Sequence, residues 1–498
     1  MFQLAQGQYL TYRSDIKPII GKKCAGCHQA GDIGPMPLTN YAEVSAYGSK
    51  IQYVTSTRQM PPWYADTAYS HFINERVLSR DEIQTIKDWV DNGMIEGAEP
   101  YGQVISSAAS VTVVPRKPEL ILSMSEPFAA DSRDLDHYRV FVIPTQLEED
   151  KWVEGIEFVP GNKKIVRHAS ISVAPSGSFD SLDRWDPRYG YYSFGGLAQT
   201  PDLPHWYTWS PQQRATYYPE GMGKFLPKGS DLVLHMHYGP NDIPQDDSSQ
   251  IRLYFTSKKI TQPVITAPLI NPYGLTNGTL YIPANTRKTF HAQYTIPYPI
   301  HLQSLTPQGN LLCRSWDVYA TVPGQPQPHR LLKIRDWNFN WKQTYRFVTP
   351  VFLPEGAVLH TIAVYDNTLD NPHHPADKPK EVTWGASPYN ELFFVHAEFI
   401  PEPIPVTDIQ LASAVVTDGP LMPVTIDVER KGYYLLEVVN PVDRSRRKLT
   451  DLNLEKGKHT VQIPVSDLNN GNYLIEVFDA EYSLVARQMF VKMWSKGM

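Results

Sequence analysis

The sequence DLVLHMHYGP, residues 231–240, decides the fold class, because apolar side chains alternate with others and a Gly-Pro turn signal follows. The next run, IRLYFTS at 251–257, repeats the pattern after a short polar segment. Short alternating runs separated by glycine, proline, asparagine and aspartate are typical of β-sandwich strands. The two runs therefore predict strands of a β-sandwich.

The same pattern extends outward over residues 117–402, where it includes RVFVIP, GIEFVP, WDVYATV, AVLHTIAVYDN and NELFFVHAEF. Because this stretch is too long for one sandwich, we divide it into two jelly-roll-like β-sandwiches, 117–260 and 261–402. A third all-β unit, expected to be an Ig-like sandwich, covers 403–498 with runs such as GYYLLEVVN and GNYLIEVFDA. A polar, valine-rich linker at 104–116 precedes all three.

The N-terminal region, residues 1–103, has the pattern of a small α-helical domain. In LSRDEIQTIKDWVDNG, Ser79 and Glu82 have the spacing of a capping box, and apolar residues recur with helical period. Gly93 follows where a left-handed cap is favoured. A shorter helix is expected in YRSDIKPII. The whole chain is therefore predicted to be mainly β, with one small helical domain.

The segment KKCAGCHQAGDIGPMPL, residues 22–38, contains two of the three cysteines of the chain, directly before a histidine. This Cys-x-x-Cys-His spacing is the attachment signature of c-type haem, in which two thiols bond to the porphyrin and the imidazole binds the iron. We therefore expect one covalent haem c, held by Cys24, Cys27 and His28. A coincidental match, a zinc site or a thiol-redox site are the alternatives, although zinc would need two further ligands nearby.

A second iron ligand is expected from a soft donor in a loop. Met60 lies in TRQMPPWYAD, where two prolines restrict the loop. Met36, in GPMPL, is the rival, but it follows His28 so closely that its loop should pack on the His28 side. We therefore predict His28 and Met60 as the iron ligands. Cys313 is left without a disulfide partner and is expected to be a small buried residue.

The composition, with a net charge of -6 over 498 residues, argues against a nucleic-acid binder, which usually carries a basic face. No apolar run approaches the roughly 20 residues of a membrane-spanning helix. Haem attachment of this kind takes place outside the cytoplasm in bacteria, so we expect an exported protein of the periplasm or cell surface. The N-terminal MFQLAQGQ lacks the basic and apolar parts of a signal peptide, and we interpret the sequence as the mature form.

Four segments form ordered blocks: VPGNKKIVRHASISV, LPKGSDLVLHMHYGP, LLKIRDWNFNWKQTYRF and YDNTLDNPHHPADKPKEVTWG. They resemble the two-domain copper monooxygenases that use ascorbate, the class of peptidylglycine alpha-hydroxylating monooxygenase and dopamine beta-monooxygenase. GPMPLTNY, RQMPPW and DWVDNG are similar to the cytochrome c domain that precedes this module in bacterial members. The resemblance covers about residues 11–400, and it implies two β-sandwiches that each hold one copper.

The resemblance implies that a His-His pair and a histidine of a later HY strand hold the first copper. In this chain the pair is Arg167-His168, and a guanidinium cannot bind metal. His237 falls on the third ligand position, and His235 projects from the same face of its strand two residues earlier. His168, His235 and His237 are therefore candidate ligands of one residual copper, with hydrogen-bonded histidines of a vestigial pocket as the alternative.

The second copper site that the resemblance implies lacks its expected ligands in this chain. The family's Pro-His-Met-His stretch aligns with TPQGN, which has Gln308 and Asn310 in place of the two histidines, and the late methionine aligns with Leu392. Copper prefers imidazole and thioether donors, so we expect no oxygen chemistry at this place. His373 and His374 lie in a proline-rich loop and are expected to be solvated.

These expectations give one functional hypothesis and two alternatives. The hypothesis is an exported electron-transfer cytochrome whose monooxygenase-like scaffold has lost catalysis, working with a redox partner protein or an envelope complex. The alternatives are a haem-bearing accessory or structural subunit of an envelope assembly, and an active copper-dependent monooxygenase. The C-terminal unit resembles the small sandwiches that end many secreted proteins of Bacteroidota, which favours an envelope or surface location.

Overall fold

The structure of the protein, a computed structural model, is mainly β, as predicted. It describes residues 9–98, 116–131, 136–194, 205–211, 213–385, 390–402, 409–413, 416–417, 420–440, 445–469 and 471–492. Residues 104–115 of the predicted linker lie outside these ranges, and only its last residue, 116, lies within them. Within them, no helix is long and apolar enough to cross a membrane.

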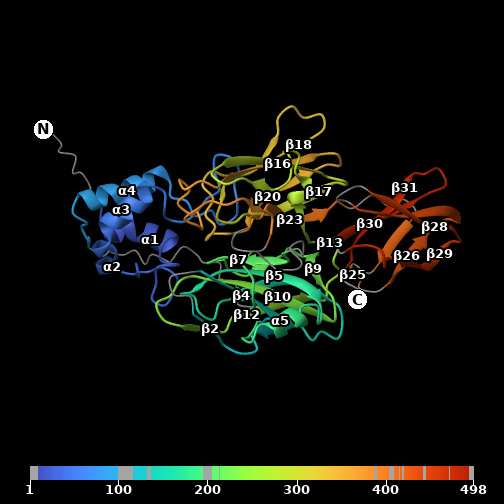
Figure 1. Cartoon of the computed structure of the whole chain (residues 1–498), viewed down its shortest axis with the longest axis horizontal. Helices are drawn as coiled ribbons and strands as arrows, with labels where there is room; N and C mark the ends of the chain where they lie inside the picture. The colour runs from blue at the N-terminus through green and yellow to red at the C-terminus, as the bar shows by residue number, and fades with distance from the viewer. Residues whose placement is uncertain are drawn as a thin grey trace.

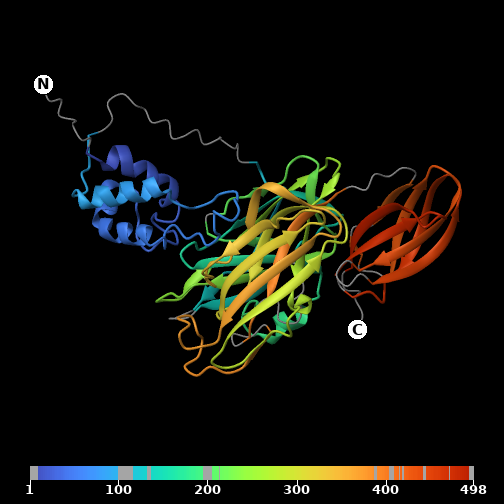
Figure 2. The same ribbon diagram turned by 90° about the horizontal axis from the view of Figure 1, so that it is seen from above.

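The chain is arranged as a helical domain, two stacked β units and a third β unit, in that order along the molecule (Figure 1). The helices lie at one end of the molecule, and the third β unit lies at the other end (Figure 1). Seen from above, the loops that follow α3 reach from the helices to the central β units (Figure 2). The helical domain therefore meets the β units through loops.

The helical domain begins with two short helices in place of the single one expected in YRSDIKPII. Pro18, which has no backbone N–H, stands in the first turn of α1 and separates it from a π-helical turn. The elements of this domain are η1 (Tyr12–Ile16), α1 (Lys17–Lys23), α2 (Tyr41–Ala46), α3 (Gly48–Ser56) and α4 (Arg80–Asp91).

The last helix of the helical domain, α4, begins and ends where its sequence predicts. The Ser79 N–H donates to Glu82 Oε2 (2.8 Å), and the Glu82 N–H donates to Ser79 Oγ (3.0 Å), which completes the capping box. Gly93 has a φ of +85°, as a left-handed cap requires. Ile86 and Trp89 are almost completely buried in the small apolar core of the domain.

The first β unit is a sandwich of two main sheets. Strands β6-β3-β10-β5-β7 form one sheet, and β1-β12-β4-β9-β13 form the other, with β8 beside β4. The elements are β1 (Leu120–Ser123), β2 (Phe128–Ala130), β3 (His137–Pro144), β4 (Lys151–Val159), β5 (Val166–Pro175), α5 (Asp180–Trp185), β6 (Tyr191–Tyr192), β7 (Tyr207–Trp209), β8 (Thr216–Tyr217), β9 (Met222–Leu226), β10 (Ser230–Tyr238), β11 (Gln245–Asp247), β12 (Gln250–Thr256) and β13 (Gln262–Pro263).

The second β unit pairs a β14-β23-β17-β20 sheet with a β16-β21-β18-β19 sheet. Its apolar core includes Cys313, which is buried as predicted. The elements are β14 (Ile265–Ile270), η2 (Pro272–Gly274), β15 (Tyr281–Ile282), β16 (Arg287–Thr295), β17 (Ile300–Gln308), β18 (Cys313–Thr321), β19 (His329–Ile334), β20 (Tyr345–Leu353), β21 (Val358–Asp366), β22 (Val382–Thr383) and β23 (Phe394–Pro401).

The third β unit has a three-stranded sheet, β24-β26-β29, and a five-stranded sheet, β25-β31-β30-β27-β28. An apolar cluster with Val424, Leu436 and Phe490 is buried within it. The elements are β24 (Ile409–Ser413), β25 (Val416–Thr417), β26 (Leu421–Val428), β27 (Gly432–Val439), β28 (Arg446–Leu454), β29 (Gly457–Pro464), β30 (Gly471–Phe478) and β31 (Leu484–Lys492).

Strand β10 is buried on both faces, although its alternating sequence is typical of a strand with one polar face. One row of its side chains, including Met236 and Tyr238, enters the core of the first unit. On the other face, the ring of His237 lies 5.9 Å from Phe339, which belongs to the second unit. Phe339 also packs against Tyr138 of β3. The second unit therefore covers the polar face of this sheet.

A buried ion network joins the same two units elsewhere. Glu398 of β23 contacts Lys224 of β9 at 2.8 Å and Arg346 of β20 at 2.6 Å. Tyr218 Oη donates a third contact to this carboxylate, at 3.0 Å. Burial alone would raise the pKa of Glu398, but the two cations lower it to about 2. The carboxylate is therefore ionised at neutral pH.

Candidate functional site

A cavity of about 280 Å³ lies where the helical domain meets the two central β units. Cys24, Cys27, His28 and Met60, the four residues expected to hold haem, all line it. They come from two separate segments, one directly after α1 and one after α3. The fold therefore brings the four predicted residues to one place.

The cysteines lie in the turn that follows α1. Cys24 caps this helix, and its carbonyl accepts hydrogen bonds from the N–H groups of Cys27 and His28, both at 3.1 Å. Neither cysteine forms a disulfide. Burial, together with the nearby Cys27 and Glu82, raises the pKa of Cys24 to about 12. At neutral pH the Cys24 side chain is therefore a neutral thiol.

The His28 ring is held by the loop that follows it. Its Nδ1 lies 3.0 Å from the carbonyl oxygen of Met36, which can only accept a hydrogen bond. Nδ1 therefore carries the proton, and Nε2 keeps a lone pair for a ligand. A Cβ on Gly34 would lie 2.7 Å from the Cys27 oxygen and 2.8 Å from His28 Nδ1, so the loop can approach this closely only with glycine there.

Met60 and Met36, the two candidate second ligands, lie in different surroundings. Met60 lines the cavity and is 39% exposed. Its N–H bonds to the Val54 carbonyl at 3.0 Å, where the chain leaves α3 through the left-handed residue Arg58. Met36 packs against the core of the helical domain and offers its carbonyl to His28. This arrangement favours Met60 as the residue that faces a ligand.

The segment after Met60, residues 63–76, runs along the second β unit. The Asp66 N–H donates to the Lys333 carbonyl, and the Ile73 N–H donates to the Arg346 carbonyl, both at 2.8 Å. Side chains add to these backbone bonds, with Tyr69 Oη donating to Asp317 (2.6 Å), Asp66 pairing with Arg335 (2.6 Å), and Phe72 packing 5.3 Å from Tyr345. The β unit thus anchors the segment that begins at Met60.

The far end of this segment returns to the cavity at Arg76. Its guanidinium donates to the Pro211 carbonyl (2.9 Å) and to Gln343 Oε1 (2.8 Å), and so contacts both central β units. It also lies 5.4 Å from the centre of the Trp341 ring, a second wall of the cavity. Sequence reasoning missed both residues, because no local pattern marks a contact between such distant segments.

The three candidate copper ligands share one face of the β5-β10 pair, where His237 lies opposite His168. His237 Nε2 is 2.9 Å from Asp136 Oδ1, and His235 Nε2 is 2.8 Å from the Ser193 carbonyl, so both nitrogens carry protons. Burial lowers the pKa of all three, that of His235 to about 4. In the described part of the chain, no three His, Cys, Asp or Glu side chains are placed to hold a metal ion.

Gln308 and Asn310, which the resemblance aligns with ligands of a second copper, are both buried. Sequence reasoning missed the carboxylate of Glu391, which lies beside Asn310. Glu391 Oε2 accepts the Asn310 N–H at 2.8 Å, and its Oε1 accepts the Leu312 N–H at 2.7 Å. Burial raises the pKa of Glu391 to about 7. The neighbouring Leu392 is also buried. This carboxylate therefore organises the β17-β18 turn.

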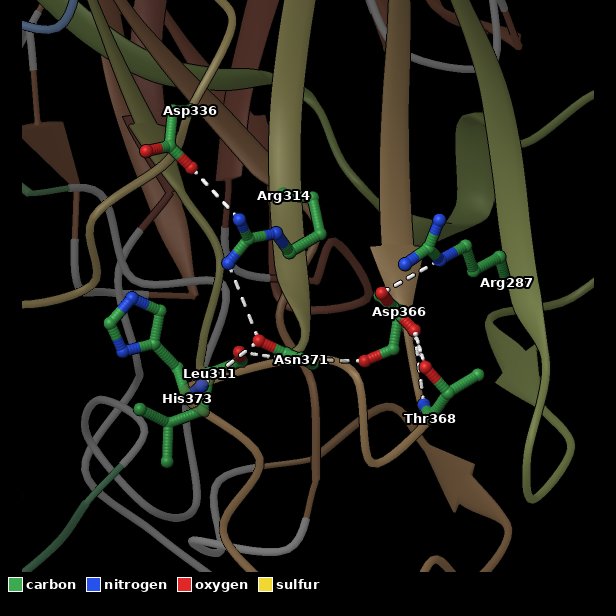
Figure 3. A network of polar contacts seen from close by, with 8 residues as sticks. All are labelled: Arg287, Leu311, Arg314, Asp336, Asp366, Thr368, Asn371 and His373. Atoms are coloured by element: carbon green, nitrogen blue, oxygen red, sulfur yellow. Dashed lines mark hydrogen bonds and ion pairs between the residues drawn. The ribbon is translucent and has the colours of Figure 1, made fainter.

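The loop with His373 and His374 is held by amides and carboxylates. Figure 3 shows Arg314 reaching both Asp336 and Asn371, while the side-chain Oδ1 of Asn371 also accepts the His373 N–H at 3.0 Å. The His373 ring points away from this network. His374 uses both ring nitrogens in hydrogen bonds, with Asn367 and with the Ala376 carbonyl. His374 is therefore a structural residue of the loop.

Comparison with known proteins identifies no family, since no protein-family model and no curated protein matches the sequence. A Ruminococcus gnavus beta-glucuronidase structure overlaps 42% of this chain and 35% of its own, with 11% identity and a TM-score of 0.13. The PNGF-II structure overlaps 66% of this chain and 71% of its own, with 10% identity and a TM-score of 0.25. The chain spans about a third of the length of the glucuronidase, and TM-scores this low assign neither a shared fold nor a shared function.

Proposed function

We propose that this chain is an exported c-type cytochrome that carries one covalent haem and transfers electrons. In this proposal its two central β units are a copper-monooxygenase-like scaffold that has lost catalysis. The meeting of Cys24, Cys27, His28 and Met60 around one cavity carries the proposal. A protein of this kind works in the periplasm or at the cell surface with a redox partner or an envelope complex.

Four residues of the cavity lining have roles in the proposed binding of haem. Cys24 and Cys27 would hold the haem through two thioether bonds, while His28 Nε2 and Met60 Sδ would bind its iron. The hydrogen bond from His28 Nδ1 to the Met36 carbonyl orients the ring and increases the basicity of Nε2. When bound, haem supplies a one-electron couple. If His28 and Met60 both bind the iron, no position would be left for oxygen, which favours electron transfer over oxygen activation.

The histidines of the first β unit support a scaffold without copper chemistry. His235 and His237 use their Nε2 protons in hydrogen bonds within the protein, and Arg167 replaces one family ligand. At the second copper site that the resemblance implies, Gln308 and Asn310 stand in place of two histidines. Metal analysis tests this point: we expect one iron and no copper per chain, whereas two coppers would overturn the proposal. One copper that is lost in His237→Ala would support a residual site.

Optical spectra of the exported protein test the haem ligands. We expect low-spin bands in the reduced wild type and no binding of carbon monoxide. Met60→Leu should remove one iron ligand and allow carbon monoxide to bind, while the matched control Met36→Leu should behave as wild type. Ready binding of carbon monoxide by the wild type, or the reverse behaviour of the two variants, would contradict Met60 as the ligand.

A further inference from the structure

The charge of the cavity lining is one-sided. Lys23, Arg76 and Arg167 line it, and the lining has no aspartate or glutamate. Lys23 has a neutral partner, since its Nζ donates to the Val77 carbonyl at 2.8 Å. A cation that leaves water without a counter-ion carries a desolvation penalty. The cavity is therefore suited to an occupant that brings negative charge.

Arg76 is a cation with neutral partners. Its contacts are a carbonyl, a carboxamide and the face of Trp341. Burial lowers its pKa, with the nearby Cys27 and Tyr345 acting in the opposite direction. These contacts fix the guanidinium at the cavity wall and leave its charge uncompensated by a carboxylate.

Arg167 reaches the cavity from the first β unit. It is half-buried on β5, and its side chain lies against Gly239, where an added Cβ would collide with the guanidinium. Burial lowers its pKa, while the negative charge of Asp136 acts in the opposite direction. Among the described residues, Arg167 makes no hydrogen bond or ion pair. Its donors therefore remain available to the cavity.

We infer that Arg167, together with Arg76, binds the carboxylate groups of the cavity occupant, which are the propionates of haem if the proposed function holds. A guanidinium presents a planar pair of donors that matches a carboxylate, which lysine cannot do. Arg167 thus turns a former copper-ligand position into a haem-binding position. Through this residue the first β unit helps to set the reduction potential.

The expected effect on the potential follows from charge. The titratable groups that line the cavity are Lys23, Cys24, Cys27, His28, Arg76 and Arg167, and the carboxylates near this lining are Glu82, which acts on Cys24, and Asp136, which acts on Arg167. Loss of the Arg167 charge leaves a propionate uncompensated, which stabilises ferric iron and lowers the potential. Without the cation the propionate also takes up a proton more readily, so the potential should rise again as the pH falls.

Redox titration of the full exported chain between pH 5 and 8 tests the inference. We expect Arg167→Gln to favour ferric iron about tenfold at pH 8, a fall of about 59 mV for a one-electron couple, and to show a steeper pH dependence than wild type. Arg167→Lys should restore most of the potential. Arg184→Gln, an equal charge change in the exposed part of α5, should leave it unchanged.

The outcomes separate this inference from the proposed function. Wild-type protein without covalent haem would overturn both. Attached haem, with Arg167→Gln and Arg184→Gln giving the same potential at every pH, would overturn the carboxylate role alone. Arg167→Met, which keeps an unbranched side chain without the charge, is the second variant if Arg167→Gln fails to fold, and the same shift and pH dependence are expected of it.

Discussion

Glu398→Gln should weaken the junction of the two central β units more than any surface substitution. The carboxylate has a pKa of about 2 in the folded protein against an ordinary value of 4.5. At about 1.4 kcal/mol per pKa unit, the ionised carboxylate stabilises the folded state by roughly 3 kcal/mol at pH 7. The variant also leaves the buried Lys224 and the half-buried Arg346 without a counter-ion. We expect a total loss of about 3–5 kcal/mol.

Hydrogen exchange of the β20 and β23 amides measures this loss where it occurs, and it does not require the whole chain to unfold in one step. A loss of 3 kcal/mol corresponds to exchange about a hundredfold faster. The matched control is Asp336→Asn, which removes the exposed partner of Arg314 and should cost no more than about 1 kcal/mol.

The pH dependence gives a second criterion for Glu398. Because its pKa is lowered on folding, its contribution is complete above the ordinary value of 4.5 and is lost as the pH falls from there toward about 2. The difference between wild type and Glu398→Gln should therefore shrink over this range. Equal effects of Glu398→Gln and Asp336→Asn at pH 7, or a difference that stays constant from pH 7 to 2, would refute the reasoning.

Four further substitutions, one of them a control, test the helical domain and its anchor. Gly34→Ala places a Cβ against the Cys27 carbonyl and should lower the yield of attached haem severalfold by mass spectrometry, whereas Gly21→Ala, with free space in α1, should stabilise the domain by up to about 1 kcal/mol. Ser79→Ala removes the α4 cap and should cost about 1 kcal/mol in thermal melts followed by circular dichroism. Tyr69→Phe removes a hydrogen bond to a β18 carboxylate, worth about 1.5–3 kcal/mol, and should speed proteolysis of segment 63–76.

Local signals in the sequence predicted local structure well. The capping box of Ser79 and Glu82 and the left-handed Gly93 define α4 through contacts within a few residues, so the sequence alone predicts them. The alternation of residues 231–240 predicted a strand but not its burial on both faces. Phe339, which covers the second face, lies about a hundred residues further along the chain, and no periodicity reports such a contact.

The residues of the candidate site also differ in whether the sequence alone predicts them. Cys24, Cys27 and His28 are predictable because their chemistry depends on spacing within one turn. Arg76 and Arg167 are not, because each is one charged residue among many until the fold brings it to the cavity. The sequence FVHAEFIP, which is otherwise mostly apolar, contains one glutamate, Glu398, and this indicates a buried charge. A buried charge in such a strand requires a partner, although the sequence does not say which one.

The cavity cannot be a property of the helical domain alone. The stretch from Met60 to Arg76, which includes segment 63–76, starts and ends at the wall of the cavity. Between these ends the segment is bonded to β19 and β20 through backbone groups, the Asp66–Arg335 pair and the packing of Phe72. A shift of the second β unit must therefore displace both ends of the segment together. Through this segment, the second β unit fixes the positions of Met60 and Arg76 at the cavity.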